Sequence, residues 1–301
     1  MIDFQDRVAV VTGAGGGLGR AYAILLASRG ASVVVNDLGG SLHGDGSSAK
    51  AADAVVEEIT GTGGVAVADY SSVAVSFGGA AIVERAVDAF GRIDVLISNA
   101  GILRDRTLLN MDVDDLRSVL SVHLEGAFYV AKPAFRQMKE QKYGRIVLTS
   151  SGSGIFGNFG QTNYAAAKAG LVGLMNALKL EGAKYNVLVN AVAPIAQTRM
   201  TEEILGEMAD KFDPESVAPA VAYLASGENQ QTGELWSVGG GSVSRVFTGL
   251  CEGYFKHPDR EGPLTIEDVA EHIDDVRIED HYIVPFSSRD EFAKLGPRLF
   301  S

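Results

Sequence analysis

The chain has 301 residues, of which 46% are hydrophobic, with one cysteine (Cys251) and a formal net charge of −12. This composition supplies a large core without disulfides, and the acidic balance excludes the basic face that a nucleic-acid partner needs. The sequence shows no signal peptide, peroxisomal address or membrane-length apolar run. We therefore expect a soluble, cytoplasmic protein with neither a nucleic-acid nor a membrane partner.

Short apolar runs alternate with helical stretches over roughly the first 240 residues. Most runs are continuously apolar, as in strands buried on both faces of a parallel sheet. The predicted strands are residues 8–11, 32–35, 65–67, 93–97, 145–148 and 186–189. Helices are predicted over residues 18–28, 49–60 and 80–90, each ending near a glycine suited to the left-handed conformation: Gly30, Gly61 and Gly91. The alternation predicts an α/β fold: a single Rossmann-type doubly wound parallel sheet with helices on both faces.

A glycine-rich segment, residues 12–20, lies between the first predicted strand and the first predicted helix. Gly13 permits a tight turn, Gly17 lets the backbone approach a pyrophosphate, and Gly19 lets the helix pack on the strand. Free amides at the helix start, where Leu18 lies, would face the phosphates. The pattern predicts a dinucleotide cofactor.

Asp37 ends the second predicted strand, 18 residues after Gly19. A carboxylate there accepts both hydroxyls of an adenine ribose and repels a 2′-phosphate, so NAD is favoured over NADP. Further cofactor contacts are predicted after the third and fourth strands, at Asp69, Tyr70, Asn99, Ala100 and Gly101. An ordinary helix cap also explains Asp69, and a structural turn also explains residues 99–101.

Tyr164 and Lys168 stand four residues apart at the start of a predicted helix, so they share one face. A nearby ammonium lowers the pKa of a phenol from its usual value of about 10 towards neutrality, as an acid–base group requires. Lys168 is also placed to hold the nicotinamide ribose, and Ser151, ending the fifth strand, to hydrogen-bond a substrate oxygen. With the upstream cofactor loop, these residues predict hydride transfer to or from a secondary alcohol or ketone, and no metal site.

The alternation of predicted strands and helices ends near residue 245. This boundary divides a cofactor-binding domain (residues 1–245) from an extension (residues 246–301). The extension holds 12 acidic and 6 basic residues, and one helix is predicted over residues 265–275. Thr265 followed by Asp268 is typical of a helix start. We expect the extension to pack on the core or on a neighbouring subunit.

The glycine loop, residues 99–101, Ser151, Tyr164 and Lys168 resemble the short-chain dehydrogenase/reductase superfamily over residues 4–243. Four segments look more closely like the (3R)-hydroxyacyl-CoA dehydrogenase domain of peroxisomal multifunctional enzyme type 2 and its bacterial homologues: residues 36–40, 101–106, 157–161 and 199–201. The resemblance implies NAD-dependent oxidation of a (3R)-hydroxyacyl-CoA in β-oxidation, including that of steroid side chains. It also implies a homodimer or homotetramer.

The sequence departs from the superfamily at His123, where many members carry an asparagine in a proton relay. His123 either serves that relay or is a packed histidine bonded to a backbone carbonyl. Thr198 is placed to reach the nicotinamide amide, and Arg104, Arg106 and Lys132 are either CoA-phosphate contacts or solvated surface charges. The alternative functions are a hydroxysteroid (17-beta type) or other free secondary-alcohol dehydrogenase, a 3-oxoacyl-carrier-protein reductase, and a non-catalytic NAD-binding module.

Overall fold

The computed structural model describes residues 1–197 and 211–300. The internal contacts of the chain divide it into two compact units, Met1–Arg245 and Val246–Ser301, which are described separately. Within the described residues, no helix is both long and apolar enough to cross a lipid bilayer.

The first unit is built on one eight-stranded sheet in the order β3-β2-β1-β4-β5-β6-β7-β8. Parallel pairing joins each neighbour from β3 through to β7. The strands are β1 Val8–Thr12, β2 Ser32–Asn36, β3 Val65–Asp69, β4 Val95–Ser98, β5 Gly144–Thr149, β6 Val187–Pro194, β7 Leu235–Gly239 and β8 Ser242–Val246. The predicted doubly wound sheet is confirmed. Its strand order reverses between β1 and β4, and ligands of such sheets bind at the carboxyl ends of the strands at this point.

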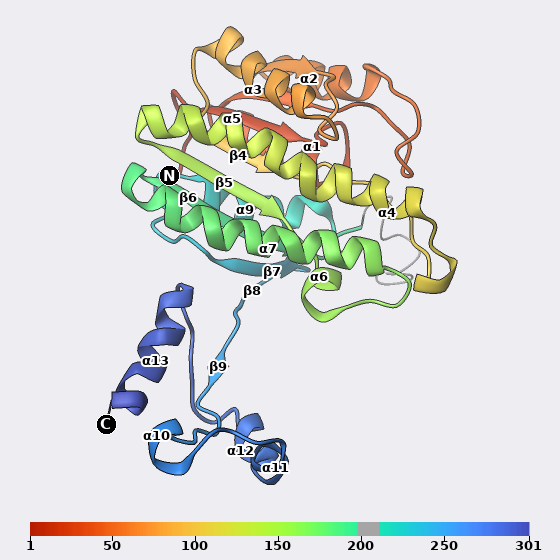
Figure 1. Ribbon diagram of the computed structural model, residues 1–301. Coiled ribbons are helices and arrows are strands. Elements are labelled where there is room, and N and C mark those ends of the chain that lie inside the picture. Colours follow the sequence, from red (N-terminus) through yellow and green to blue (C-terminus); the bar gives the residue numbers. More distant parts are fainter. Residues whose placement is uncertain (198–210, 301) are drawn as a thin grey trace. The chain divides into compact units, whose positions relative to one another are not determined.

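Helices cover both faces of the sheet (Figure 1). On one face α1 contacts α2 and α9, and on the other α3 contacts α5 while α4 and α6 contact α7. These helices are α1 Gly17–Ser28, α2 Lys50–Gly61, α3 Ser76–Phe90, α4 Val113–Leu120, α5 Gly126–Gln141, α6 Gly152–Phe156, α7 Thr162–Gly182 and α9 Ala218–Ala225. A π-helical turn, Ser121–Glu125, joins α4 to α5.

The sheet is buried because its strands are apolar on both faces, as the continuous runs predict. All five residues of β1 are buried, and Val33, Val34 and Val35 of β2 have no exposed surface. The carboxyl ends of these strands are thereby held rigidly, and they position the loops that follow them.

Two of the three predicted glycine caps are confirmed. Gly30 and Gly91 have φ values of 97° and 79°, just beyond α1 and α3. The prediction for Gly61 is wrong, because α2 continues through Gly61 and the left-handed position is Gly63, with φ of 87°. Three glycines lie within residues 61–64, so composition alone does not tell which one reverses the chain.

The second unit contains four short helices and one antiparallel strand pair, β9 Leu250–Cys251 with β10 Tyr282–Ile283. The helices are α10 Pro258–Glu261, α11 Ile266–Glu271, α12 Ile273–Arg277 and α13 Ser288–Phe300. Thr265 and Asp268 form a reciprocal capping box at the start of α11, as their spacing predicts. The single helix predicted over residues 265–275 is interrupted at His272, which separates α11 from α12.

Candidate active site

The glycine-rich turn between β1 and α1 is tightly packed against the loop that follows β4. Gly13 has a φ of 65°, and a Cβ on it would lie 2.7 Å from the Cα of Ala100. A Cβ on Gly19 would collide with the Gly13 carbonyl oxygen. The Asn99 side chain donates hydrogen bonds to the carbonyl oxygens of Thr12 (3.1 Å) and Gly13 (3.2 Å). Asn99 therefore holds the shape of the turn.

The amino end of α1 is open to an anion. Gly16 is the N-cap residue and has no side chain to cap the helix, so the first-turn amides of Gly17, Leu18 and Gly19 have no side-chain partner there. These amides and the helix dipole favour a negatively charged group. The turn therefore fits the pyrophosphate of a dinucleotide.

Asp37 follows β2 and its carboxylate lies beside this turn. One oxygen accepts a hydrogen bond from the Gly15 amide at 2.8 Å, and the other accepts one from the Gly39 amide at 2.7 Å. The side chain is only partly buried, so its remaining lone pairs are available to ribose hydroxyls. A 2′-phosphate at the same place would meet a negative charge.

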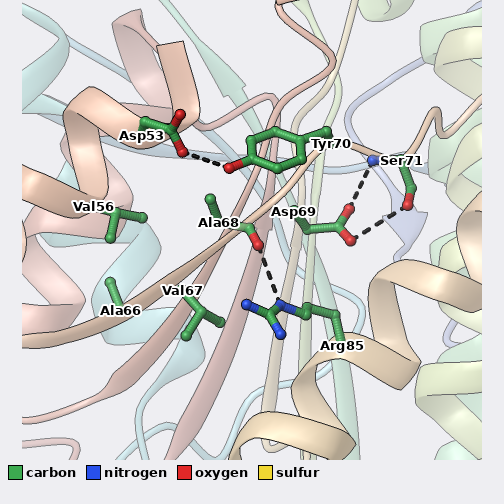
Figure 2. Close-up of a pocket in the computed structure, with 9 residues that line it drawn as sticks. All are labelled: Asp53, Val56, Ala66, Val67, Ala68, Asp69, Tyr70, Ser71 and Arg85. Atoms are coloured by element: carbon green, nitrogen blue, oxygen red, sulfur yellow. Dashed lines mark hydrogen bonds between the residues drawn. The ribbon is translucent and has the colours of Figure 1, made fainter. Parts of the chain in front are cut away.

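The residues after β3 have strong partners within the protein. The Asp69 carboxylate accepts hydrogen bonds from Asn36 Nδ2 (2.7 Å) and the Ser71 amide (2.9 Å). Tyr70 is exposed, and its hydroxyl donates to Asp53. Both residues line a pocket of about 740 Å³ beside β3, together with Arg85. Figure 2 shows the side chains that line it. None of the predicted catalytic residues lines this pocket, so it is separate from the catalytic groups.

Ser151, Tyr164 and Lys168 converge at the carboxyl end of β5. Ser151 is the N-cap of α6, and Tyr164 and Lys168 lie one turn apart on α7. The Ser151 hydroxyl lies close enough to the Tyr164 phenol to lower its pKa. Lys168 Nζ lies 5.5 Å from the centre of the Tyr164 ring and donates to the Thr149 carbonyl oxygen at 2.6 Å. The predicted constellation is therefore brought together in space.

Burial opposes the charged form of both ionisable groups. It raises the pKa of Tyr164 to about 12, against the lowering effect of the Ser151 hydrogen bond. It lowers the pKa of Lys168 to about 7. The predicted positive partner, Lys168, lies beside the phenol, but burial dominates the pKa of Tyr164.

His123 lies in the π-helical turn and is buried at 3% exposure. Its ring packs edge-on against Tyr164, with ring centres 5.1 Å apart. Nε2 is 3.0 Å from the Ile102 amide nitrogen and 2.7 Å from the Ile102 carbonyl oxygen, and either contact anchors the ring. Burial lowers the pKa of His123 well below its usual value, so the ring is neutral. Nδ1 is buried and has no hydrogen-bond partner among the described residues.

Thr198 and Arg104 are candidate ligand contacts from the sequence. Thr198 lies outside the described residues. Arg104, considered above for CoA phosphates, is engaged within the protein: its Nε donates to the His43 carbonyl oxygen at 3.0 Å, and the guanidinium lies 3.7 Å from Asp115. No cluster of metal-binding side chains occurs in the part of the chain that the structure describes.

Asp105 and Gln161, for which the sequence predicted no role, lie beside Tyr164. Gln161 Nε2 donates to Asp105 Oδ2 at 2.6 Å, and the backbones of Arg106 and Gln161 form an isolated parallel β-bridge. The only sequence signal was that both residues lie in segments shared with the multifunctional enzymes.

A dinucleotide turn, a doubly wound sheet and a serine–tyrosine–lysine set at its carboxyl edge define a nicotinamide-nucleotide oxidoreductase. A family model described as short chain dehydrogenase matches residues 7–208. A short-chain type dehydrogenase/reductase of Mycobacterium tuberculosis is 54% identical over 88% of this chain and 92% of that protein. The chain therefore belongs to the short-chain dehydrogenase family, whose members act on hydroxyl groups, and the resemblance is confirmed.

Peroxisomal multifunctional enzyme type 2 of Drosophila melanogaster is 50% identical over 89% of this chain, which spans only 44% of that enzyme. The solved structure of the full-length Drosophila enzyme matches with a TM-score of 0.84 and 40% identity, over 99% of this chain and 50% of that one. A short chain dehydrogenase from Mycobacterium avium matches with a TM-score of 0.76 and 41% identity, over 91% of this chain and 97% of that one.

Proposed function

We propose that this protein oxidises a (3R)-hydroxyacyl-CoA to the 3-oxoacyl-CoA with NAD, using Tyr164 as the acid–base group. The observation that carries the chemistry is the convergence of Ser151, Tyr164 and Lys168 at the end of β5. Similarity to peroxisomal multifunctional enzymes supports the acyl-CoA substrate class, as it covers 89% of this chain.

The cofactor is NAD in this proposal because of Asp37. The glycine turn and the free amides of α1 fit a pyrophosphate, and the Asp37 carboxylate beside them fits an unphosphorylated adenine ribose. Lys168 would hold the nicotinamide ribose. Bound NAD⁺ supplies a hydride acceptor and a positively charged ring.

Tyr164 removes the proton of the substrate hydroxyl, and the Ser151 hydroxyl holds the same oxygen in place. The phenol must first lose its own proton, which burial resists by raising the pKa of Tyr164 to about 12. The ammonium of Lys168 offsets part of this cost, because an opposite charge nearby favours the phenolate. This electrostatic assistance is the reason for a buried lysine at this position.

His123 belongs to the same site in this proposal. Its Nε2 is anchored on the Ile102 backbone, while Nδ1 is buried without a partner among the described residues. The anchored ring supports the edge of Tyr164, and a water molecule at Nδ1 would connect it to a proton relay. The relay stays a prediction.

The test compares initial rates of NAD⁺ and NADP⁺ reduction across a small substrate panel. The panel comprises medium-chain (3R)- and (3S)-hydroxyacyl-CoA, a steroid side-chain thioester, the free 3-hydroxy acid and a 17β-hydroxysteroid. We expect the highest kcat/KM for a 3R thioester with NAD⁺. Equal turnover of the free alcohols would exclude the CoA dependence, and activity with NADP⁺ alone would contradict the role of Asp37.

A further inference from the structure

Two loops that are far apart in the sequence meet beside Tyr164. The loop after β4 reaches Asp105, and the segment before α7 ends at Gln161, 56 residues later. Gln161 is 4% exposed and uses both ends of its amide. Its Nε2 donates to Asp105 Oδ2 at 2.6 Å, while its Oε1 accepts from Ser153 Oγ (2.8 Å) and Asn158 Nδ2 (2.9 Å).

A second side chain joins the same two segments. Asn163 Nδ2 donates to the Arg104 carbonyl oxygen at 3.0 Å, and Asn163 Oδ1 accepts from the Tyr164 amide at 2.8 Å. The start of α7, and with it Tyr164, is therefore tied to the loop after β4 through both Asn163 and Gln161. Such ties restrict the position of the reacting group, on which oriented catalysis depends.

The Asp105 carboxylate is only half satisfied. Oδ2 has its bond from Gln161, but Oδ1 is buried and has no hydrogen-bond partner among the described residues. An unsatisfied buried carboxylate oxygen is costly, so it needs an explanation beyond the bond that Oδ2 makes. Its charge acts on Tyr164, whose phenolate it disfavours.

We propose that Asp105 is a positioning residue for Tyr164, which it holds through Gln161 while its carboxylate places a negative charge near the phenol. This inference rests on the proposed role of Tyr164 as acid–base group. The other groups that face Tyr164 are Lys168, which is cationic when protonated, neutral His123 and the Ser151 hydroxyl. Asp105 is the one anion among these described neighbours, and its charge acts on Tyr164.

The variant Asp105→Asn tests the electrostatic role, because it removes the carboxylate charge and keeps the hydrogen bond from Gln161. The asparagine oxygen still accepts from Gln161, but the negative charge is gone. Removing an anion lowers the pKa of a neighbouring phenol, so the rising limb of the kcat/KM–pH profile for alcohol oxidation should move about 0.5 to 1 pH unit lower. The rate above that limb should stay within about threefold of wild type.

Gln161→Leu tests the positioning role, because it keeps the Asp105 charge and removes the hydrogen bond between Gln161 and Asp105. We expect about a tenfold loss in kcat without the downward shift of the pH profile. Thermal unfolding of each variant shows that it is folded. Asp88→Asn, which removes one negative charge from an exposed position of α3, is the matched control and should leave the profile unchanged.

An Asp105→Asn profile that coincides with that of wild type would overturn the electrostatic role, and an unaltered kcat in Gln161→Leu would overturn the positioning role. Tyr164→Phe separates these failures from failure of the proposed function. If Tyr164→Phe is inactive while the Asp105→Asn profile is unmoved, only the inference about Asp105 fails. If Tyr164→Phe stays active, the proposed acid–base group itself is wrong.

Discussion

At the scale of one residue, Lys168 shows that burying a positive charge lowers the folding stability of the protein. Burial lowers the pKa of Lys168 to about 7, whereas the unfolded chain has the ordinary value of 10.5. Between these two values the unfolded state binds more protons than the native state, so stability rises with pH across this window. Below about pH 7 the native protein carries the full cost of a buried ammonium.

Lys168→Met should therefore stabilise the cofactor-free protein most at low pH. We expect an increase of about 1–3 kcal/mol in the free energy of unfolding at pH 6, because an apolar side chain replaces a buried charge. The gain should shrink towards pH 10, and catalytic activity should be lost. Urea unfolding at several pH values measures this, with Lys132→Met, at an exposed position of α5, as the control. Equal pH dependence of the two variants would contradict the account.

At the scale of elements, the loop after β4 and the π-helical turn fit together only because Gly101 has no side chain. A Cβ on Gly101 would collide with Cε1 of His123, whose ring is anchored on Ile102 and packs on Tyr164. The glycine in this segment is therefore required by the histidine of another element. From the sequence, Gly101 is predicted to lie against the cofactor.

Gly101→Ala should displace the His123 ring and disturb Tyr164. We expect a loss of about 1–3 kcal/mol in unfolding free energy, typical of overpacking in a core, and a fall in kcat of at least about tenfold. Gly61→Ala, at the exposed end of α2 with open space around its Cβ, should be neutral or slightly stabilising. Urea unfolding and initial rates measure both variants, and the prediction fails if they behave alike.

The first six strands and the helices between them could largely be predicted from local pattern, but the contacts between elements could not. Continuous apolar runs predicted the starts of the first six strands to within two residues and their ends to within five, because strands buried on both faces need such runs. The four-residue spacing of Tyr164 and Lys168 sufficed for that pair. No local sequence pattern predicted the π-helical turn. The hydrogen bond between Asp105 and Gln161 could not be predicted either, because no periodicity relates residues that are 56 positions apart.

At the scale of the whole molecule, the two units differ in how their apolar side chains are placed. The first unit buries an extensive core around its sheet. In residues 246–300, by contrast, no apolar side chain is buried, and His257 is the one buried residue. A unit without a core of its own gains little from folding alone. This supports the prediction that the extension packs on another surface, and whether that is the core or a neighbouring subunit stays a prediction.

The most direct test of the account is the initial rate of NAD⁺ reduction with a medium-chain (3R)-hydroxyacyl-CoA, measured for the wild type and for Tyr164→Phe. The phenylalanine keeps the ring that packs against His123 and removes only the hydroxyl. We expect a fall in kcat of about a thousandfold with unchanged NAD⁺ binding. A variant that oxidises the thioester within a few fold of the wild-type rate would contradict it.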